Sequence, residues 1–204
     1  MIAPMLLQRI QQQFIDSADT TYQCAQSLGS SVELAVGAVL AAVTSGGKVL
    51  ACGNGTSAGL VQSFASAFVG RFERERPELA ALALGGNAAL MSMAGGDVRT
   101  LYAREVRALG LPGDVLLLVT SLPQAPEILG AVEAAHERDM TVVALCGSRA
   151  GTLAQALKDT DVLVHAPADR VARIDEVHQV VLHCICDGVD VQLLGDEAQE
   201  EFVE

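Results

Sequence analysis

The chain has 204 residues, half of them hydrophobic, and a net charge of −12 at neutral pH. This length is sufficient for one domain with a sizeable core, or for one domain with a helical arm. The negative charge disfavours direct binding to DNA or RNA, because such binding depends largely on Lys and Arg contacts with phosphates. It remains compatible with a basic protein partner.

The cysteine content and the hydrophobic pattern favour a cytoplasmic protein. The five cysteines show no disulfide framework, which is typical of a reducing compartment. No apolar run reaches the roughly 20 residues needed to cross a bilayer. The N-terminal stretch lacks a cationic start followed by a long apolar core, so we expect no signal peptide and no membrane association.

Two helices are predicted before the first strand, over residues 5–28 and 30–45. Apolar residues recur at helical spacing in the first, and Gly46-Gly47 is a strong stop for the second. Because both helices precede the first strand and their apolar faces need a partner, we interpret residues 1–46 as an N-terminal helical arm for oligomerisation.

Strands and helices alternate from residue 48 onward. The predicted strands are 48–52, 79–84, 114–120, 141–147 and 161–167, and the predicted helical segments are 57–72, 87–109, 125–138, 150–158 and 170–193. Apolar strands without polar alternation indicate a parallel sheet covered on both faces. We therefore predict an α/β fold, a three-layer, doubly wound, five-stranded parallel sheet over residues 47–194, followed by an acidic tail over 195–204. Its binding crevice should lie beyond the carboxyl ends of the strands.

A glycine-rich loop follows the first predicted strand and opens a helix. Its residues Asn54, Gly55, Thr56 and Ser57 offer backbone N–H groups and hydroxyls at a helix N-terminus, which favours an anion such as phosphate. The loop matches neither a Walker A motif nor GxGxxG, so nucleoside triphosphates and dinucleotides are disfavoured. A glycine turn with Ser or Thr as the helix cap explains the same residues.

A second loop follows the third predicted strand. Thr120 and Ser121 place two adjacent hydroxyls at the same edge of the sheet, where they are suited either to bind phosphate or to cap the next helix. Pro123 and Pro126 remove two N–H donors from this loop, which makes it a poorer anion site than a Gly/Ser loop.

Five segments together resemble a known family. They are CGNGTSAGLVQSF, RFERERPELAALAL, VRALGLPGDVLLLVT, AVEAAHERDMTVVALCG and ARIDEVHQVVLHCICD. In this order they are similar to the flavodoxin-like sugar isomerase (SIS) fold, in the branch that contains bacterial phosphoheptose isomerase and the DnaA initiator-associating proteins. The resemblance extends to about residue 194, and it implies a phosphosugar crevice and a homotetramer.

The catalytic motif of the isomerases is altered in this chain. In that family a His, a Glu, a Gln and a second His gather zinc, and the Glu and second His transfer protons. The aligned positions here are Ser63, Ala67, Asp175 and His183. Alanine neither ligates a metal nor accepts a proton, so we expect no catalytic residues and no metal cofactor. If the chain is active, His183 and Asp175 remain as acid and base, while His178 is expected on the helix surface.

The resemblance and the altered motif lead us to expect a non-catalytic scaffold. This homotetramer would bind the replication initiator DnaA and promote chromosomal initiation, with Leu193 and Leu194 as the partner contact. The alternative is a phosphoheptose isomerase acting on sedoheptulose 7-phosphate, or another sugar-phosphate isomerase. A third possibility is a sensor that binds a phosphosugar without converting it.

Overall fold

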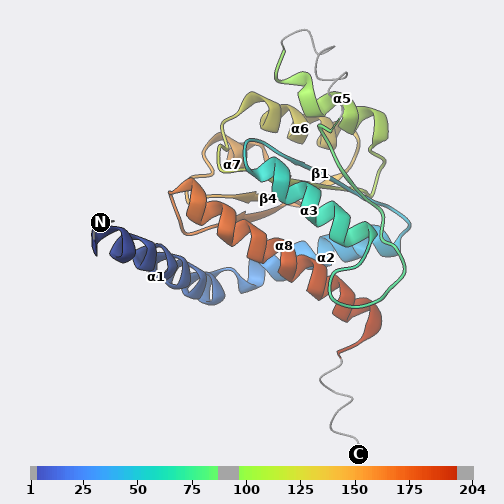
Figure 1. The fold of residues 1–204 in the computed structure, drawn as a ribbon. Helices are drawn as coiled ribbons and strands as arrows, with labels where there is room; N and C mark the ends of the chain where they lie inside the picture. Colours follow the sequence, from blue (N-terminus) through green and yellow to red (C-terminus); the bar gives the residue numbers. More distant parts are fainter. Residues whose placement is uncertain (1–3, 87–96, 197–204) are drawn as a thin grey trace, which may run out of the picture.

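The computed structural model describes residues 4–86 and 97–196, in which a parallel sheet lies between two layers of helices (Figure 1). Its five strands are ordered β2-β1-β3-β4-β5, and every neighbouring pair is parallel. The strands are β1 Val49–Gly53, β2 Ala81–Ala83, β3 Val115–Val119, β4 Thr141–Cys146 and β5 Val162–His165. The prediction of an α/β fold with a doubly wound, five-stranded parallel sheet is confirmed.

The central strands are buried on both faces, as their uninterrupted apolar sequences predict. Every residue of β1 and β3 is buried. The register places Leu50 beside Leu116, which in turn lies beside Val142. Helices exclude water from both faces of these strands. Because the strands are parallel and in this register, the carboxyl ends of β1, β3 and β4 lie along one edge of the sheet.

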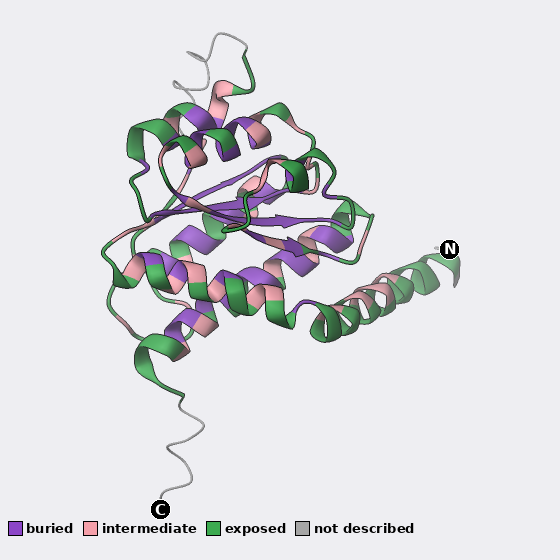
Figure 2. Cartoon of the chain, turned by 180° about the vertical axis from the view of Figure 1, so that it is seen from behind, coloured by how far each residue is buried: buried purple, intermediate pink, exposed green. Residues whose placement is uncertain are grey.

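In the part of the chain that the structure describes, helices cover both faces of the sheet. One face carries α2 (Gly29–Thr44), α3 (Ser57–Val69) and α8 (Val171–Leu194), and the other carries α5 (Thr100–Leu109), α6 (Pro126–Glu137) and α7 (Thr152–Ala156). The alternation of side chains along β1 divides the core, since Val49 contributes to the first cluster and Leu50 to the second. The buried residues between sheet and helices are visible in Figure 2.

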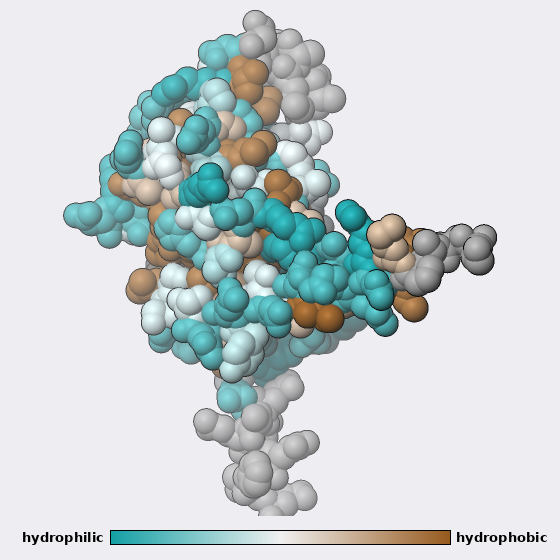
Figure 3. Space-filling view, turned by 90° about the vertical axis from the view of Figure 1, so that its left-hand side faces the viewer, coloured by the Kyte–Doolittle hydropathy of each residue, from teal (hydrophilic) through white to brown (hydrophobic). Residues whose placement is uncertain are grey.

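The first helix, α1 (Pro4–Ser27), extends away from the rest of the molecule (Figure 1). It is tied to α8 by the Ser17 hydroxyl, which donates to Glu176 over 2.7 Å, and by Arg173, which donates to the Gln13 carbonyl over 2.7 Å. Hydrophobic side chains are exposed near its N-terminal end (Figure 3). Its exposed large apolar residues are Met5, Leu6, Leu7, Ile10, Phe14, Ile15 and Tyr22. The helix therefore presents an apolar surface that nothing in the described chain covers.

The second helix differs from α1 because it packs into the core through Ala35, Val39 and Ala42.

No individual helix within the described ranges combines the length and the apolar character of a membrane span. The helices α1 and α2 meet that test only when they are taken together, and they are bent by 72° at the break between them. The division of the chain into an arm ending at residue 46 and a separate domain stays a prediction.

A buried ion pair fixes the far end of α8 beside α3. Arg76 Nε lies 2.5 Å from Asp190 Oδ1, and each side chain is 1% exposed. The same guanidinium donates to the carbonyls of Ala67 and Phe68 in the last turn of α3. One arginine thus satisfies free carbonyls at the end of α3 and neutralises a carboxylate on α8.

The predicted boundaries differ from the structure mainly around the second strand. The β2 strand covers Ala81–Ala83 instead of 79–84, because it is an edge strand that pairs only with β1. Part of the predicted helical segment 87–109 lies outside the described residues, and α5 begins at Thr100. These differences do not affect the strand order.

Candidate functional site

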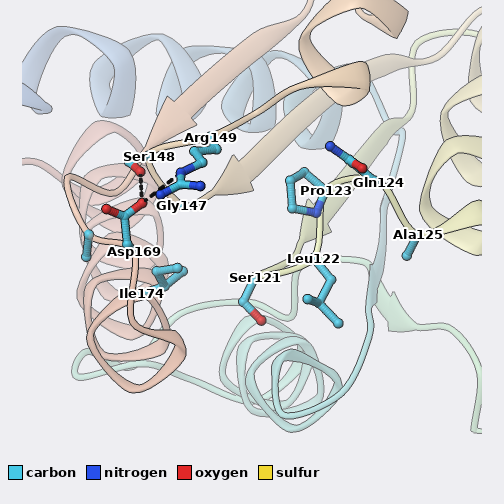
Figure 4. A pocket seen from close by; sticks show the side chains of 11 residues that line it. Ser121, Leu122, Pro123, Gln124, Ala125, Gly147, Ser148, Arg149, Asp169 and Ile174 are labelled. Carbon is cyan, nitrogen blue, oxygen red and sulfur yellow. Dashed lines mark hydrogen bonds and ion pairs between the residues drawn. The ribbon is translucent and has the colours of Figure 1, made fainter.

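A cavity of about 550 Å³ lies at the carboxyl ends of β3, β4 and β5, where the sequence predicts the binding crevice (Figure 4). Its walls come from the loops that follow these three strands. The lining residues are Ser121, Leu122, Pro123, Gln124, Ala125, Gly147, Ser148, Arg149, Ala168, Asp169 and Ile174. Among the predicted ligand-binding residues, Ser121 therefore lies in the cavity wall.

The turn after β1 depends on two glycines. A Cβ atom at Gly53 would lie 2.7 Å from the carbonyl oxygen of Val119, so the close approach of β1 and β3 requires glycine here. Gly55 has a φ of 56°, in the left-handed region. The turn delivers Ser57 to the first position of α3, where the free N–H groups of the helix favour a negative charge.

The structure joins the two predicted loops through Asn54. Its side-chain carbonyl accepts a hydrogen bond from the Thr120 hydroxyl over 2.9 Å, and its amide donates to Glu127 over 3.0 Å. Thr120 is fully buried, and its hydroxyl oxygen also accepts the N–H of Leu122 over 2.8 Å. Asn54 and Thr120 thus lie together as the sequence predicts, but both side chains already have protein partners.

Thr56 and Ser57 lie against the first turns of α8. The Thr56 hydroxyl donates to Asp175 Oδ2 over 2.5 Å, and the Ser57 hydroxyl donates to Oδ1 over 3.3 Å. The carboxylate of Asp175 therefore lies beside the first turn of α3, near the end at which a helix favours an anion. The structure thereby brings Asp175 to the predicted phosphate loop.

Buried polar groups support this loop from the other face of the sheet. The Tyr102 hydroxyl donates to the carbonyl of Gly53 over 2.5 Å. Burial raises the pKa of Tyr102, and the nearby Cys52, Glu127 and Glu105 raise it further, so the phenol stays protonated as a donor. Burial likewise raises the pKa of Cys52, which remains a neutral thiol.

A second, smaller cavity of about 200 Å³ lies farther along α3 and α8. Its lining residues are Ser63, Phe64, Ala67, Arg71, Phe72, Gln179, Leu182, His183 and Cys186. The exposed His183 has a ring nitrogen 2.5 Å from Gln179 Nε2, and its ring centroid lies 5.2 Å from that of Phe72. The positions aligned with the isomerase motif at 63, 67 and 183 therefore do converge, whereas Asp175 lies eight residues before His183, about 12 Å along the helix.

The expectation for His178 is wrong, because this side chain is fully buried. Neither of its ring nitrogens has a partner at full hydrogen-bond geometry among the described residues, although the backbone of Cys146 lies close enough to interact with the ring. Burial lowers the pKa of His178, although the Cys146 backbone and the Asp175 carboxylate partly oppose this effect. The imidazole is consequently neutral and belongs to the packing between α8 and the sheet.

Comparison with known proteins agrees with the fold and extends over nearly the whole chain. The SIS domain model matches residues 13–147. The phosphoheptose isomerase of Methylibium petroleiphilum is 52% identical over 95% of this chain and 98% of its own length. The phosphoheptose isomerase of Azoarcus sp. is 45% identical over 94% of this chain and 98% of its own length. The chain belongs to the phosphoheptose isomerase family of SIS-domain proteins.

Solved structures of this family superpose closely on the chain. A phosphoheptose isomerase from Francisella tularensis gives a TM-score of 0.86 at 36% identity, covering 90% of this chain and 97% of its own. A phosphoheptose isomerase from Neisseria gonorrhoeae gives a TM-score of 0.85 at 38% identity, covering 91% of this chain and 98% of its own. The α/β architecture is therefore that of the isomerases.

These comparisons correct the functional expectation. The hypothesis of a non-catalytic scaffold for DnaA is wrong, because the full-length relatives and the close structural neighbours are phosphoheptose isomerases. It relied on the altered motif at Ser63 and Ala67, and it treated a change of catalytic side chains as a change of function. The alternative, a sugar-phosphate isomerase, is the better supported reading.

The residues at the family's zinc position do not fit a zinc ion. Ser63 and Ala67 supply no imidazole or carboxylate, and Asp175 is held at the Thr56–Ser57 turn. Within residues 4–86 and 97–196 there is no group of three or more His, Cys, Asp or Glu side chains that could hold a metal. Zinc binding prefers four such ligands, or three with a water. No step of the chemistry is therefore assigned to a metal.

Two groups at the crevice escaped the sequence analysis. Glu127 contacts Asn54, and Arg149 lines the large cavity. The signal for Arg149 was its position three residues after β4, and that for Glu127 was its position in the first turn of the helix that follows β3; both lie at the edge of the sheet where ligands bind. Leu193 and Leu194, predicted as a partner contact, end α8 with 39% and 42% of their surface exposed.

Proposed function

We propose that the chain is a sugar-phosphate isomerase that interconverts sedoheptulose 7-phosphate and the isomeric aldose phosphate. The observation that carries this proposal is the 52% identity with a phosphoheptose isomerase over 95% of the chain. The crevice at the carboxyl edge of the sheet supports it, because open parallel sheets bind their ligands there. A 550 Å³ cavity also has the volume of a small-molecule site.

The proposed ligand site comprises Asn54, Gly55, Thr56, Ser57, Thr120 and Ser121, of which Ser121 lines the large cavity, while the buried Ser57 and Thr120 support the two loops from within. Their hydroxyl and amide groups suit a polyhydroxylated sugar, which needs directional donors and acceptors. The contacts of Asn54 with Thr120 and of Thr56 with Asp175 support this role, because they fix the first loop before a ligand arrives.

The proposed proton transfer requires a group other than residue 67. Aldose–ketose isomerisation moves a proton between adjacent carbons, and one base that remains in place is sufficient for that transfer. His183 is exposed in the smaller cavity, and its imidazole is the one histidine side chain among the described residues that line it, so it is the first candidate for the base. Asp175 is the second candidate, since it borders the predicted phosphate loop. The proposed reaction uses no metal.

The proposed assembly is a homotetramer in the cytoplasm. The exposed apolar residues of α1 support an oligomer, because an isolated helix with this surface gains stability by packing against another copy. The five cysteines, all in the described part of the chain, form no disulfide, which suits a reducing compartment. Closed symmetry is the usual outcome when a single chain associates with itself.

A second candidate function is phosphosugar binding without conversion. The specific observation in its favour is Ala67, which removes the carboxylate that the motif would place in the smaller cavity. The fold and the crevice would then be retained for recognition alone.

A coupled assay decides between these candidates. Purified protein is treated with EDTA and incubated with sedoheptulose 7-phosphate, and the aldose product is measured. We expect turnover that survives EDTA and is not increased by added zinc. Absence of turnover, together with a thermal shift on adding the same sugar phosphate, would establish binding without conversion. Absence of both turnover and thermal shift would refute the two candidates together.

A further inference from the structure

The first loop is poorly suited to hold the phosphate group itself. Its two hydroxyls, on Thr56 and Ser57, already donate to the carboxylate of Asp175. A phosphate placed there would have to displace that carboxylate or share its donors. Because like charges at close range repel, Asp175 opposes a phosphate at the start of α3.

The second loop presents a similar obstacle. The Thr120 hydroxyl donates to Asn54 and accepts from the Leu122 N–H, so its hydrogen-bonding capacity is largely used. Pro123 and Pro126 have no N–H to offer. The carboxylate of Glu127 lies in the first turn of α6 and therefore takes the place that an anion would prefer. Both helix N-termini of the first two loops thus face acidic side chains.

The wall of the large cavity formed by the loops after β4 and β5 carries a cation, Arg149, together with its ion-pair partner Asp169. Within the described chain, Arg149 is the only basic residue that lines this cavity. Its side chain is 86% exposed, and its ion pair with Asp169 has an Nε to Oδ1 distance of 3.3 Å. Figure 4 shows Arg149 and Asp169 on one side of the cavity, with Ser121, Pro123 and Gln124 on the other. An exposed pair of this kind contributes little to stability and exchanges partners readily.

Other arginines near the crevice are engaged elsewhere. Arg170 contacts Asp16 and Gln13 on α1, and Arg173 contacts Glu176 and the Gln13 carbonyl. These contacts tie α1 to α8 and direct both guanidinium groups away from the large cavity. Arg149 is consequently the cation that a ligand in the cavity would meet.

We infer that Arg149 binds the phosphate group of the sugar phosphate, within the cavity that it shares with Ser121 and Ser148. This inference rests on the proposed function and adds the orientation of the ligand. A guanidinium forms charge-assisted, bidentate hydrogen bonds with phosphate, which compensates for the weak anion site of the second loop. Asp169 accepts from both Arg149 and Ser148, so a phosphate here must also displace a carboxylate; this pair differs from Asp175 because the Arg149 and Asp169 side chains are 86% and 65% exposed, and the guanidinium supplies a full positive charge. The carbonyl end of the sugar then extends toward the first loop and α8.

Isothermal titration with two ligands tests this assignment. Sedoheptulose 7-phosphate and unphosphorylated sedoheptulose are titrated into the wild type, Arg149→Gln, Arg149→Lys and the control Arg104→Gln. Arg104 is an exposed arginine on α5 that does not line the cavity, so its variant removes the same charge elsewhere. We expect Arg149→Gln to weaken binding of the phosphate ester about tenfold or more, with no change for the free sugar. The affinity of Arg149→Lys for the phosphate ester should lie between those of Arg149→Gln and the wild type, and the affinity of Arg104→Gln should equal that of the wild type.

Two results would overturn the inference in distinguishable ways. If the wild type prefers the phosphate ester and Arg149→Gln retains that preference, the phosphate lies elsewhere while the proposed function stands. If the wild type does not bind the phosphate ester at all, the inference and the proposed function both fail. Thermal melting of each variant confirms folding, which is expected because the Arg149 side chain is 86% exposed.

Discussion

The two ends of the α3–α8 pair differ sharply in their chemistry. At the start of these helices, Thr56, Ser57 and Asp175 form a hydrogen-bonded cluster beside the crevice. Farther along, the smaller cavity contains Ala67 and an exposed His183. In the first region a carboxylate accepts from two hydroxyls, whereas in the second the polar side chains of Ser63, Arg71, Gln179 and His183 surround a position without a carboxylate, Ala67. Under the proposed function, ligand positioning would depend on the first region and proton transfer on the second.

The largest expected effect concerns the smaller cavity. Replacing His183 with Ala or Gln should reduce kcat for sedoheptulose 7-phosphate by about 10²- to 10⁴-fold, because neither side chain transfers a proton. The neighbouring Cys184→Ala variant serves as the control, since Cys184 is also exposed on α8. An unchanged kcat in both His183 variants would show that another residue acts as the base.

The next effect concerns the buried Arg76–Asp190 ion pair, which holds the far end of α8 beside α3. Arg76→Ala leaves Asp190 buried without a partner, so we expect a loss of about 3–5 kcal/mol in the free energy of unfolding, measured with urea. Arg71→Ala removes an exposed i,i+4 pair with Glu75 and should cost no more than about 1 kcal/mol. Equal losses in the two variants would contradict the distinction between a buried anchor and a surface pair.

His178, between the two regions, should make stability depend on pH. Burial lowers the folded-state pKa of His178, so the unfolded chain binds the proton first. The contribution of neutral His178 to the free energy of unfolding is complete above the pKa of the unfolded state, about 6.5. It is lost as the pH falls from there toward the lower pKa of the folded state, by at most about 1.4 kcal/mol per pH unit. Urea unfolding between pH 8 and pH 5 should show a smaller decline for His178→Leu than for the wild type. Parallel declines would contradict this account.

The smallest expected effect concerns the start of the pair. Asp175→Asn removes a negative charge beside Thr56 and Ser57, so the phosphate ester should bind about twofold to tenfold more tightly. Asp187→Asn, on an exposed part of α8, controls for net charge. Titration calorimetry measures both variants, and weaker binding by Asp175→Asn alone would show that Asp175 itself holds the ligand.

The sequence was sufficient to predict the sheet and the edge at which the site lies. The apolar run Val115–Val119 is buried throughout, because a central parallel strand admits no polar face. The positions of Asn54 and Thr120 followed from the same rule, since each comes directly after a strand. These features depend on local patterns, which a single sequence contains.

The partners of the site residues could not be predicted in the same way. Thr56 and Asp175 are 119 positions apart, and their contact depends on how α3 and α8 pack. His178 was expected at the surface, yet it lies on the face of α8 that is buried against the sheet, next to Val177 and Val181, where the site accommodates a neutral imidazole. The function was mispredicted because Ala67 was weighed more heavily than the similarity of the remaining chain.

Proton exchange with solvent tests the central claim most directly. The metal-stripped protein is incubated with sedoheptulose 7-phosphate in D₂O, and the carbon next to the carbonyl is followed by NMR. We predict that deuterium enters this position and that the aldose phosphate accumulates, with both signals lost in His183→Ala. Binding of the sugar phosphate with neither deuterium incorporation nor aldose formation would contradict the assignment as an isomerase.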